Sequence, residues 1–175
     1  MTGGPHDQEE KPDFAELSNR VYRLCLSLLG SEVEASDAGQ EAMVRAWSRR
    51  GSRRAEVSWW TWCGGFAVRV CREMWRHRQR DRRVSELDVH ELNPAVVREG
   101  LSQDDTTRLH VSVMQLPRRQ REVTILRFFA GLSVQEAAQV LGCPPGTVKS
   151  NLHKAIQTLR RSLADRDKLD ELQGI

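Results

Sequence analysis

The sequence predicts an all-α protein built as two small helical domains joined by a linker. Apolar residues recur at the helical spacing of three and four along most of the 175 residues, and no stretch sustains the alternation typical of strands. Start and stop signals divide this pattern into separate helices. Charge then groups the helices, because residues 45–83 hold 12 basic against 3 acidic residues and residues 116–163 hold 8 against 2, with an acidic stretch between them.

The first two helices are indicated by an apolar stripe and a helix cap. The apolar residues of segment 14–28 fall on one helical face, and Gly30 is a natural stop. Ser31 and Glu34 then have the spacing of a capping box, in which each side chain accepts a backbone N–H of the other residue. A second helix is therefore expected from this box to about Arg50.

A third helix is expected over residues 58–80, and its start holds three of the five tryptophans of the chain. On a helical wheel Trp59 and Trp60 fall among the apolar residues, which predicts that both rings pack in the core. The basic face of the same helix holds Trp62, Arg69, Arg72 and Arg76.

Two interpretations of Trp62 remain open. An aromatic ring beside guanidinium groups is a common device for stacking on the bases of single-stranded DNA. The same ring also fits a half-buried structural residue that makes a cation–π contact with Arg69. The helical wheel favours neither interpretation.

The C-terminal half predicts a helix-turn-helix unit. Segment 116–131 reads as a helix with proline near its start and glycine at its end. Ser133 and Glu136 form another capping box, and the short helix that they open ends at Gly142. Pro145 then begins a long last helix, so that two helices meet at a tight turn.

The last helix has one apolar and one polar side. The apolar side, which can pack on the preceding helix, holds Val148, Leu152, Ile156, Leu159 and Leu163. The polar side holds Lys149, Ser150, His153 and Lys154, with Asn151 at its margin. These donors and acceptors suit base edges and phosphates in a major groove. The alternative is an ordinary helical hairpin with a polar outer face.

The sequence holds no motif of an enzyme, a metal site or a membrane segment. Its four cysteines and five histidines are dispersed without CxxC or HExxH spacing, and the cysteines are expected to be small buried hydrophobes. No nucleophile–base pair or phosphate-binding glycine loop is found. The longest apolar stretch, 24–29, is far too short to span a bilayer. A non-enzymatic cytoplasmic protein without metal or cofactor is therefore expected.

Three segments resemble one known family. "DAGQEAMVRAW" (37–47) and "TWCGGFAVRVCREMWRHRQR" (61–80) resemble two consecutive helices of bacterial sigma factors, and 116–163 resembles their fourth conserved region. The two-domain form with a short linker is similar to the extracytoplasmic-function (ECF) group. The resemblance implies a region 2-like helical bundle followed by a region 4-like helix-turn-helix domain.

The resemblance also implies roles for particular residues. Docking on the clamp of the largest subunit of core RNA polymerase falls to Asp37, Gln40, Glu41, Arg45 and Trp47. Capture of the melted minus-ten element falls to the loop 52–59 and the third helix, through Arg53, Arg54, Trp62, Arg69, Arg72 and Arg76. Reading of the minus-thirty-five element falls to Arg127, Lys149, Ser150, Asn151, His153 and Lys154.

The chain also departs from the family pattern. Gly39 stands where the family usually has a large apolar residue, and Gly64 and Gly65 replace a usual aromatic–basic pair. Arg69 replaces a frequent asparagine, and Asn151 replaces a frequent arginine. These last two changes bear on the promoter sequence that is read rather than on the class of activity.

The expected organisation follows from these motifs. A disordered N-terminus (1–12) precedes a region 2-like domain (13–83), an acidic linker (84–113), a region 4-like domain (114–165) and a C-terminal tail (166–175). The expected function is that of an initiation factor with core RNA polymerase, promoter DNA and an anti-sigma factor as partners, and without membrane insertion. The acidic N-terminus and linker are expected to mask the DNA surfaces. The alternative is a stand-alone helix-turn-helix regulator that does not act as a sigma subunit.

Overall fold

The computed structural model describes residues 12–82 and 103–173 and, of these, the side chains of 12–80 and 108–163. Within these residues all regular elements are helical, and they form the predicted two-domain, all-α fold. No helix in this part of the chain combines the length and apolarity needed to cross a membrane. The predicted N-terminal segment and most of the predicted linker lie outside the described residues.

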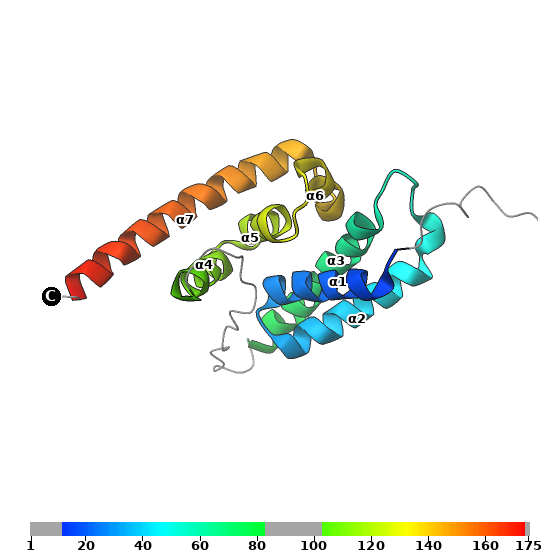
Figure 1. Cartoon of the computed structure of the whole chain (residues 1–175), viewed down its shortest axis with the longest axis horizontal. Coiled ribbons are helices and arrows are strands. Elements are labelled where there is room, and N and C mark those ends of the chain that lie inside the picture. The colour runs from blue at the N-terminus through cyan, green and yellow to red at the C-terminus, as the bar shows by residue number, and fades with distance from the viewer. Residues whose placement is uncertain (1–11, 83–102, 174–175) are drawn as a thin grey trace, which may run out of the picture.

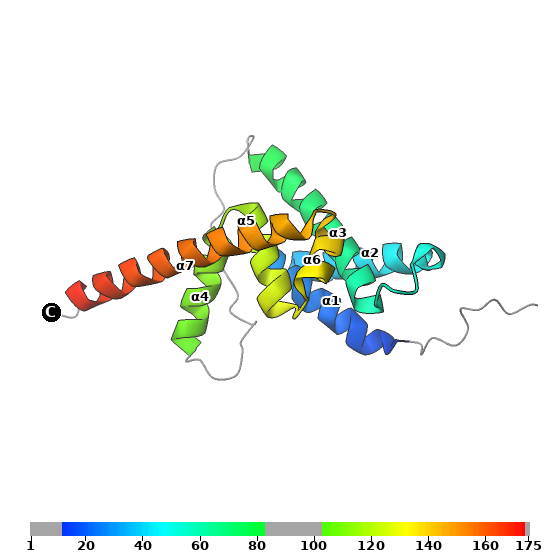
Figure 2. The same ribbon diagram turned by 90° about the horizontal axis from the view of Figure 1, so that it is seen from above.

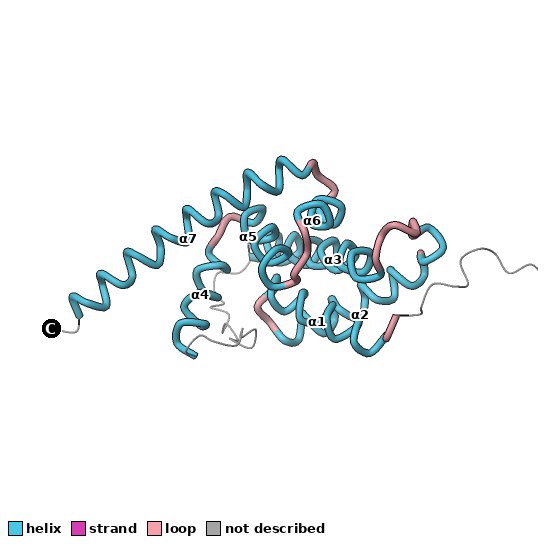
Figure 3. Tube along the Cα trace, turned by 45° about the horizontal axis from the view of Figure 1, so that its top comes forward, coloured by secondary structure: helices cyan, strands magenta, loops and turns pink. Residues whose placement is uncertain are grey.

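The N-terminal domain is a bundle of three helices, α1 (Phe14–Leu29), α2 (Glu32–Ser48) and α3 (Trp59–Arg82). Asp13 caps α1 by accepting two backbone N–H groups, and Gly30 ends it in the left-handed conformation with φ of 73°. Ser31 caps α2, whereas Glu34 turns away to pair with Arg78 of α3. A short 3₁₀ turn, η1 (Arg50–Ser52), opens the irregular loop that leads into α3 (pink in Figure 3).

The C-terminal domain comprises α4 (Gln103–Gln115), α5 (Arg118–Thr124), α6 (Val134–Leu141) and α7 (Pro145–Gln173). A π-helical segment, η2 (Ile125–Phe129), continues directly from α5. The predicted capping box is present in full, because Ser133 and Glu136 exchange side-chain to backbone bonds at 2.8 and 3.2 Å. Gly142 ends α6 with φ of 63°, and Pro145 begins α7, which completes the expected helix-turn-helix.

Three features of this domain differ from the sequence-based expectation. The helix over 116–131 is α-helical only to Thr124 and then widens, with the N–H of Ala130 bonded to the carbonyl of Ile125. Helix α4 begins at Gln103, so the boundary expected at residue 114 falls inside it. Helix α7 continues through most of the segment expected to be a tail.

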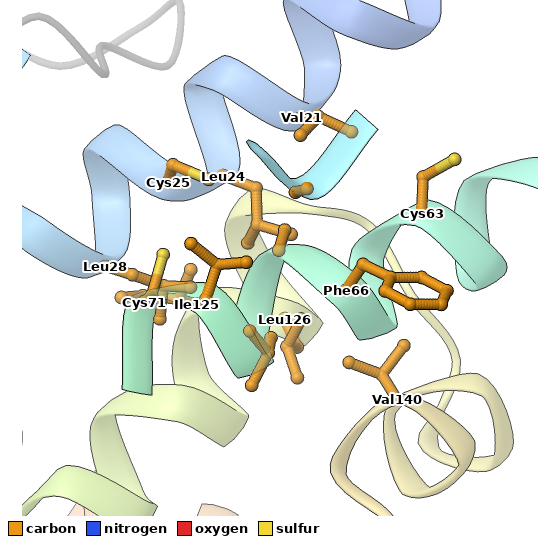
Figure 4. Close-up of a cluster of buried hydrophobic side chains, with 14 of the residues drawn as sticks. Val21, Leu24, Cys25, Leu28, Cys63, Phe66, Cys71, Ile125, Leu126 and Val140 are labelled. Carbon is orange, nitrogen blue, oxygen red and sulfur yellow. The ribbon is translucent and has the colours of Figure 1, made fainter. Parts of the chain in front are cut away.

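The two domains share one hydrophobic core. Figures 1 and 2 both show α6 beside α3, and helix η2 also contacts α1. In Figure 4, Ile125 and Leu126 of η2 lie among side chains of α1 and α3, and both are at most 1% exposed. Val68 of α3 is also 1% exposed. The core therefore crosses the domain boundary.

Candidate nucleic-acid interface

The start of α7 presents a polar face away from its domain. The exposed residues of this face are Lys149, Ser150, His153 and Lys154. Val148 and Ala155, on the opposite side, are fully buried, which fixes the orientation of the helix. Asn151 is half-buried, and its side-chain amide donates to the carbonyl of Thr147 at 2.8 Å. The helix thus offers cationic and hydrogen-bonding groups at the position that a recognition helix requires.

Arg127 lies in the π-helical segment rather than on α7. Its side chain is exposed, and its guanidinium donates to the carbonyl of Leu132 at 3.2 Å. This bond holds Arg127 beside the loop that leads into α6. The π-helical widening that positions it has no signal in the local sequence pattern.

The basic residues of the loop and of α3 are held in two different ways. Arg54, Arg69 and Arg76 are exposed. Arg53 is half-buried, with its guanidinium 4.4 Å from the ring of Trp59 and a bond to the carbonyl of Val57. Arg53 therefore anchors the loop, while the exposed arginines present their charge to solvent.

Trp62 is held by both α2 and α3. It is half-buried, and its indole Nε1 donates to the carbonyl of Ala46 at 3.1 Å. The last four carbonyls of a helix have no intrahelical partner, so this bond satisfies a free acceptor at the end of α2. The ring also meets Phe66 edge to face, with centroids 5.1 Å apart. Arg69 lies over Phe66 rather than over Trp62, so the cation–π contact differs from the one considered in the sequence.

Arg49 is a further cation beside this aromatic pair, and sequence reasoning did not single it out. It is exposed, and its guanidinium lies 5.9 Å from the centroid of the Phe66 ring. Arg49, which directly follows α2, and Arg69 of α3 thus approach one ring. The basic composition of residues 45–83 was the available signal, but composition does not say which arginines converge.

The outward face of α2 carries the residues expected to dock on a partner. Asp37, Gln40 and Glu41 are exposed on one side of the helix. Arg45 pairs at 2.7 Å both with Glu41 and with Glu73 of α3, and it therefore braces the two helices.

Exposed apolar side chains extend this face of α2. Val33 and Val44, which sequence reasoning did not select, are 74% and 61% exposed, and Trp47 is 45% exposed. Val33 and Val44 stand four and seven positions from Asp37, and this helical spacing could have indicated a shared face. A pocket of about 360 Å³ opens beside them, lined by Phe14, Met43, Val44, Trp47, Trp59 and Cys63. The mixture of acidic and apolar groups suits a helical partner.

Gly39 does not belong to this outward face. It is buried where α2 crosses α1, and a Cβ built on it would meet the backbone of Tyr22 at 3.5 Å. The glycine therefore governs the packing of α1 against α2, and the family's usual large apolar residue has no room at this crossing.

Comparison with protein families gives two matches on this chain. The model of Sigma-70 region 2 matches residues 14–81, which span the N-terminal bundle. The model of Sigma-70, region 4 matches residues 106–159, which include the helix-turn-helix. The second match begins near the start of α4, in agreement with the structure.

Curated relatives match over nearly the whole chain. The RNA polymerase sigma-E factor of Streptomyces antibioticus is 30% identical over 169 residues, covering 91% of this chain and 89% of that protein. The ECF RNA polymerase sigma factor SigW of Bacillus subtilis is 28% identical over 171 residues, covering 91% of each chain.

Solved structures show the same fold. The sigma factor RpoE of Bartonella quintana, in complex with the anti-sigma factor NepR, aligns with a TM-score of 0.75 at 22% identity, over 87% of this chain and 94% of that one. CnrH, in complex with the cytosolic domain of CnrY, aligns with a TM-score of 0.64 at 22% identity, over 87% of this chain and 85% of that one.

Proposed function

The chain belongs to the ECF group of RNA polymerase sigma factors, which act in transcription initiation, and on this premise we propose a division of labour among its helices. Helix α2 binds core RNA polymerase, the loop 52–59 with α3 captures the melted minus-ten element, and α7 reads the minus-thirty-five element. The protein acts by binding and performs no covalent chemistry.

The observation that carries this proposal is the separation of three chemically different surfaces on three helices. Helix α2 exposes acidic and apolar side chains together, which suits a protein partner. Helix α3 exposes Arg69 and Arg76 near a half-buried tryptophan, which suits a single strand with unstacked bases. Helix α7 exposes lysines with hydrogen-bonding side chains, which suits duplex DNA.

The direct test is transcription by purified core RNA polymerase, with and without this protein, on fragmented genomic DNA from its source. We expect specific start sites that depend on the protein, with two shared sequence elements upstream of them. Sequence-specific DNA binding without new transcripts and without association with core polymerase would instead support a stand-alone regulator.

Matched variants test the surfaces of α2 and α7. Val44→Asp should weaken association with core polymerase, whereas Ser18→Asp, at an exposed position of α1, should not. Lys149→Ala should weaken binding to minus-thirty-five duplex and reduce its salt dependence by about one ion, whereas Gln139→Ala on α6 serves as the control. If a test variant and its control have the same effect on binding, the corresponding surface is assigned incorrectly.

An anti-sigma factor is the remaining partner that we propose. The structural neighbour RpoE was solved with the anti-sigma factor NepR bound, and CnrH was solved with the cytosolic domain of CnrY bound. The exposed apolar side chains of α2 and the pocket beside Trp47 supply a surface that a regulator could cover in competition with polymerase. Competition between a candidate regulator and core polymerase, measured with Val44→Asp as the comparison, tests this assignment.

A further inference from the structure

One predicted DNA contact is already occupied in the free protein. Arg72 of α3 and Glu122 of α5 form a bidentate ion pair across the domain junction, with both bonds at 2.8 Å. Their side chains are only 15% and 5% exposed. Glu122 also pairs with Arg118 and Arg119 at 3.5 and 3.3 Å, but these two residues belong to its own helix. Of these contacts, the one to Arg72 joins the two domains.

Weaker contacts join the two domains elsewhere along α3. The Trp60 indole donates to the carbonyl of Ala130 (3.3 Å), the Thr61 hydroxyl donates to Glu136 (3.4 Å), and the Arg121 guanidinium lies over the Trp75 ring (4.5 Å). Gly64 allows close approach, because a Cβ placed on it would lie 3.8 Å from Val140 of α6. The C-terminal domain therefore covers one whole side of α3, next to the side that bears Arg69 and Arg76.

Beside the shared apolar core, the junction holds a cluster of buried charges, and this part of the contact suits opening. Burying charges costs free energy that their mutual attraction only partly recovers, so an apolar junction of equal size would be tighter. Arg72, Arg121 and Glu122 are all withdrawn from water here, and burial lowers the pKa of Arg121. Among the contacts described, no carboxylate lies at hydrogen-bonding distance from Arg121. Its guanidinium donates to the carbonyl of Leu116 at 3.4 Å and lies over the Trp75 ring.

We propose that the Arg72–Glu122 pair is a latch that holds the two domains together in the free protein, with the Glu122 carboxylate occupying the guanidinium that would otherwise bind a DNA phosphate. Carboxylate and phosphate both present paired oxygens to the planar fork of arginine, so a phosphate competes with Glu122 for the Nε and Nη2 donors of Arg72. The masking group is therefore part of the basic C-terminal segment, and not only of the acidic segments to which the sequence assigned this role. The competition with DNA rests on the proposed function, whereas the closed state does not.

The closed state is tested by the distance between the domains in the full-length protein. Spin labels at Ser18→Cys and Gln139→Cys, both exposed, report this distance by pulsed electron paramagnetic resonance in a Cys143→Ser background. The three other cysteines are buried. We expect one short distance in the parent protein and at least a tenfold larger long-distance fraction in Glu122→Gln and in Arg72→Gln, in line with the loss of a buried partner.

Two controls separate the latch from general damage. Arg118→Gln removes a partner of the same Glu122 from within α5, and it should leave the distance short. The double variant Arg72→Gln/Glu122→Gln should open no further than either single variant, because both changes remove the same interaction. A short distance in both single variants, with circular dichroism showing folded protein, would overturn the latch.

The competition is tested on fork DNA that exposes a single-stranded minus-ten element. Glu122→Gln should bind this DNA about tenfold more tightly than the parent protein, whereas Arg118→Gln should not, and Arg72→Gln should lose the gain although it opens. If Glu122→Gln opens without any gain in affinity, the latch stands but Arg72 is not a DNA contact. That result contradicts the proposed role of Arg72 and the competition, and it leaves the conformational result intact.

Discussion

Trp62 offers a test that separates a structural role from a role in opening DNA, because its indole N–H and its ring face do different work. Trp62→Phe removes the bond to the carbonyl of Ala46 but keeps an aromatic face. A typical hydrogen bond contributes about 0.5–1.5 kcal/mol, so the free energy of unfolding should fall by about 1 kcal/mol. For a protein of this size, that change lowers the melting temperature by about 2–4 °C.

Trp62→Ala removes the ring as well. The half-buried ring contacts Phe66, so truncation should cost roughly half the 3–5 kcal/mol of a fully buried aromatic residue. If the ring also stacks on a base, open-complex formation loses a further ~1–3 kcal/mol, which is a decrease of about 5- to 150-fold. Association with core polymerase should change little, because Trp62 lies away from the exposed face of α2.

The assay compares linear promoter DNA with a template that carries a pre-melted bubble at the minus-ten element. Trp62→Ala should fail on the duplex and recover on the bubble, and Trp62→Phe should resemble the parent on both templates despite its lower stability. Equal loss by Trp62→Ala on both templates, in a protein that is still folded at the assay temperature, refutes the stacking role. Trp62 would then be a structural cap of α2.

Three further outcomes concern stability. Gly39→Ala should raise the free energy of unfolding by about 0.5–1 kcal/mol in a denaturant melt. Its methyl group would meet the Tyr22 backbone at 3.5 Å, an ordinary van der Waals distance, and alanine favours the helix. Gly39→Leu should lower the free energy of unfolding, and a stabilising leucine would contradict the helix crossing described. Burial lowers the pKa of His110, so the unfolded chain binds the proton more readily than the folded protein. The free energy of unfolding should therefore fall from pH 7.5 to 5.5, as the pH drops through the unfolded pKa of about 6.5. In urea melts, His110→Gln should show a smaller change of this free energy with pH, and an unchanged pH dependence would assign the effect to other groups. Ser133→Ala should cost about 1 kcal/mol through loss of the α6 cap, and a thermal melt identical to that of the parent would show that the cap is dispensable.

The parts of the fold that could be predicted are those set by local chemistry. Gly30 and Gly142 end helices because both adopt positive φ, and the Ser133–Glu136 box begins one because its bonds are made within a single turn. The polar face of α7 was predictable for a related reason, since the apolar stripe that begins at Val148 lies within the helix itself and indicates which residues face outward. Each of these signals lies within a few residues of the feature that it sets.

The parts that could not be predicted depend on contacts between distant segments. Arg72 and Glu122 are 50 positions apart, and each reads in isolation as an ordinary exposed charge on a helix. Val68 of α3 lines a small pocket together with Arg121 and Glu122 of α5, and the periodicity of α3 does not show such a neighbour. Trp62 shows the same limit, because the acceptor of its indole N–H lies on another helix.

The apolar core that crosses the domain boundary has a thermal consequence. Separating the domains exposes side chains such as Ile125, Leu126 and Val68 to water, and exposure of apolar surface raises the heat capacity. The attraction between apolar surfaces also weakens on cooling, so this contribution to domain closure diminishes in the cold. Domain separation should therefore carry a positive heat-capacity change in calorimetry, and temperature becomes a variable that shifts the balance between the packed and the separated protein.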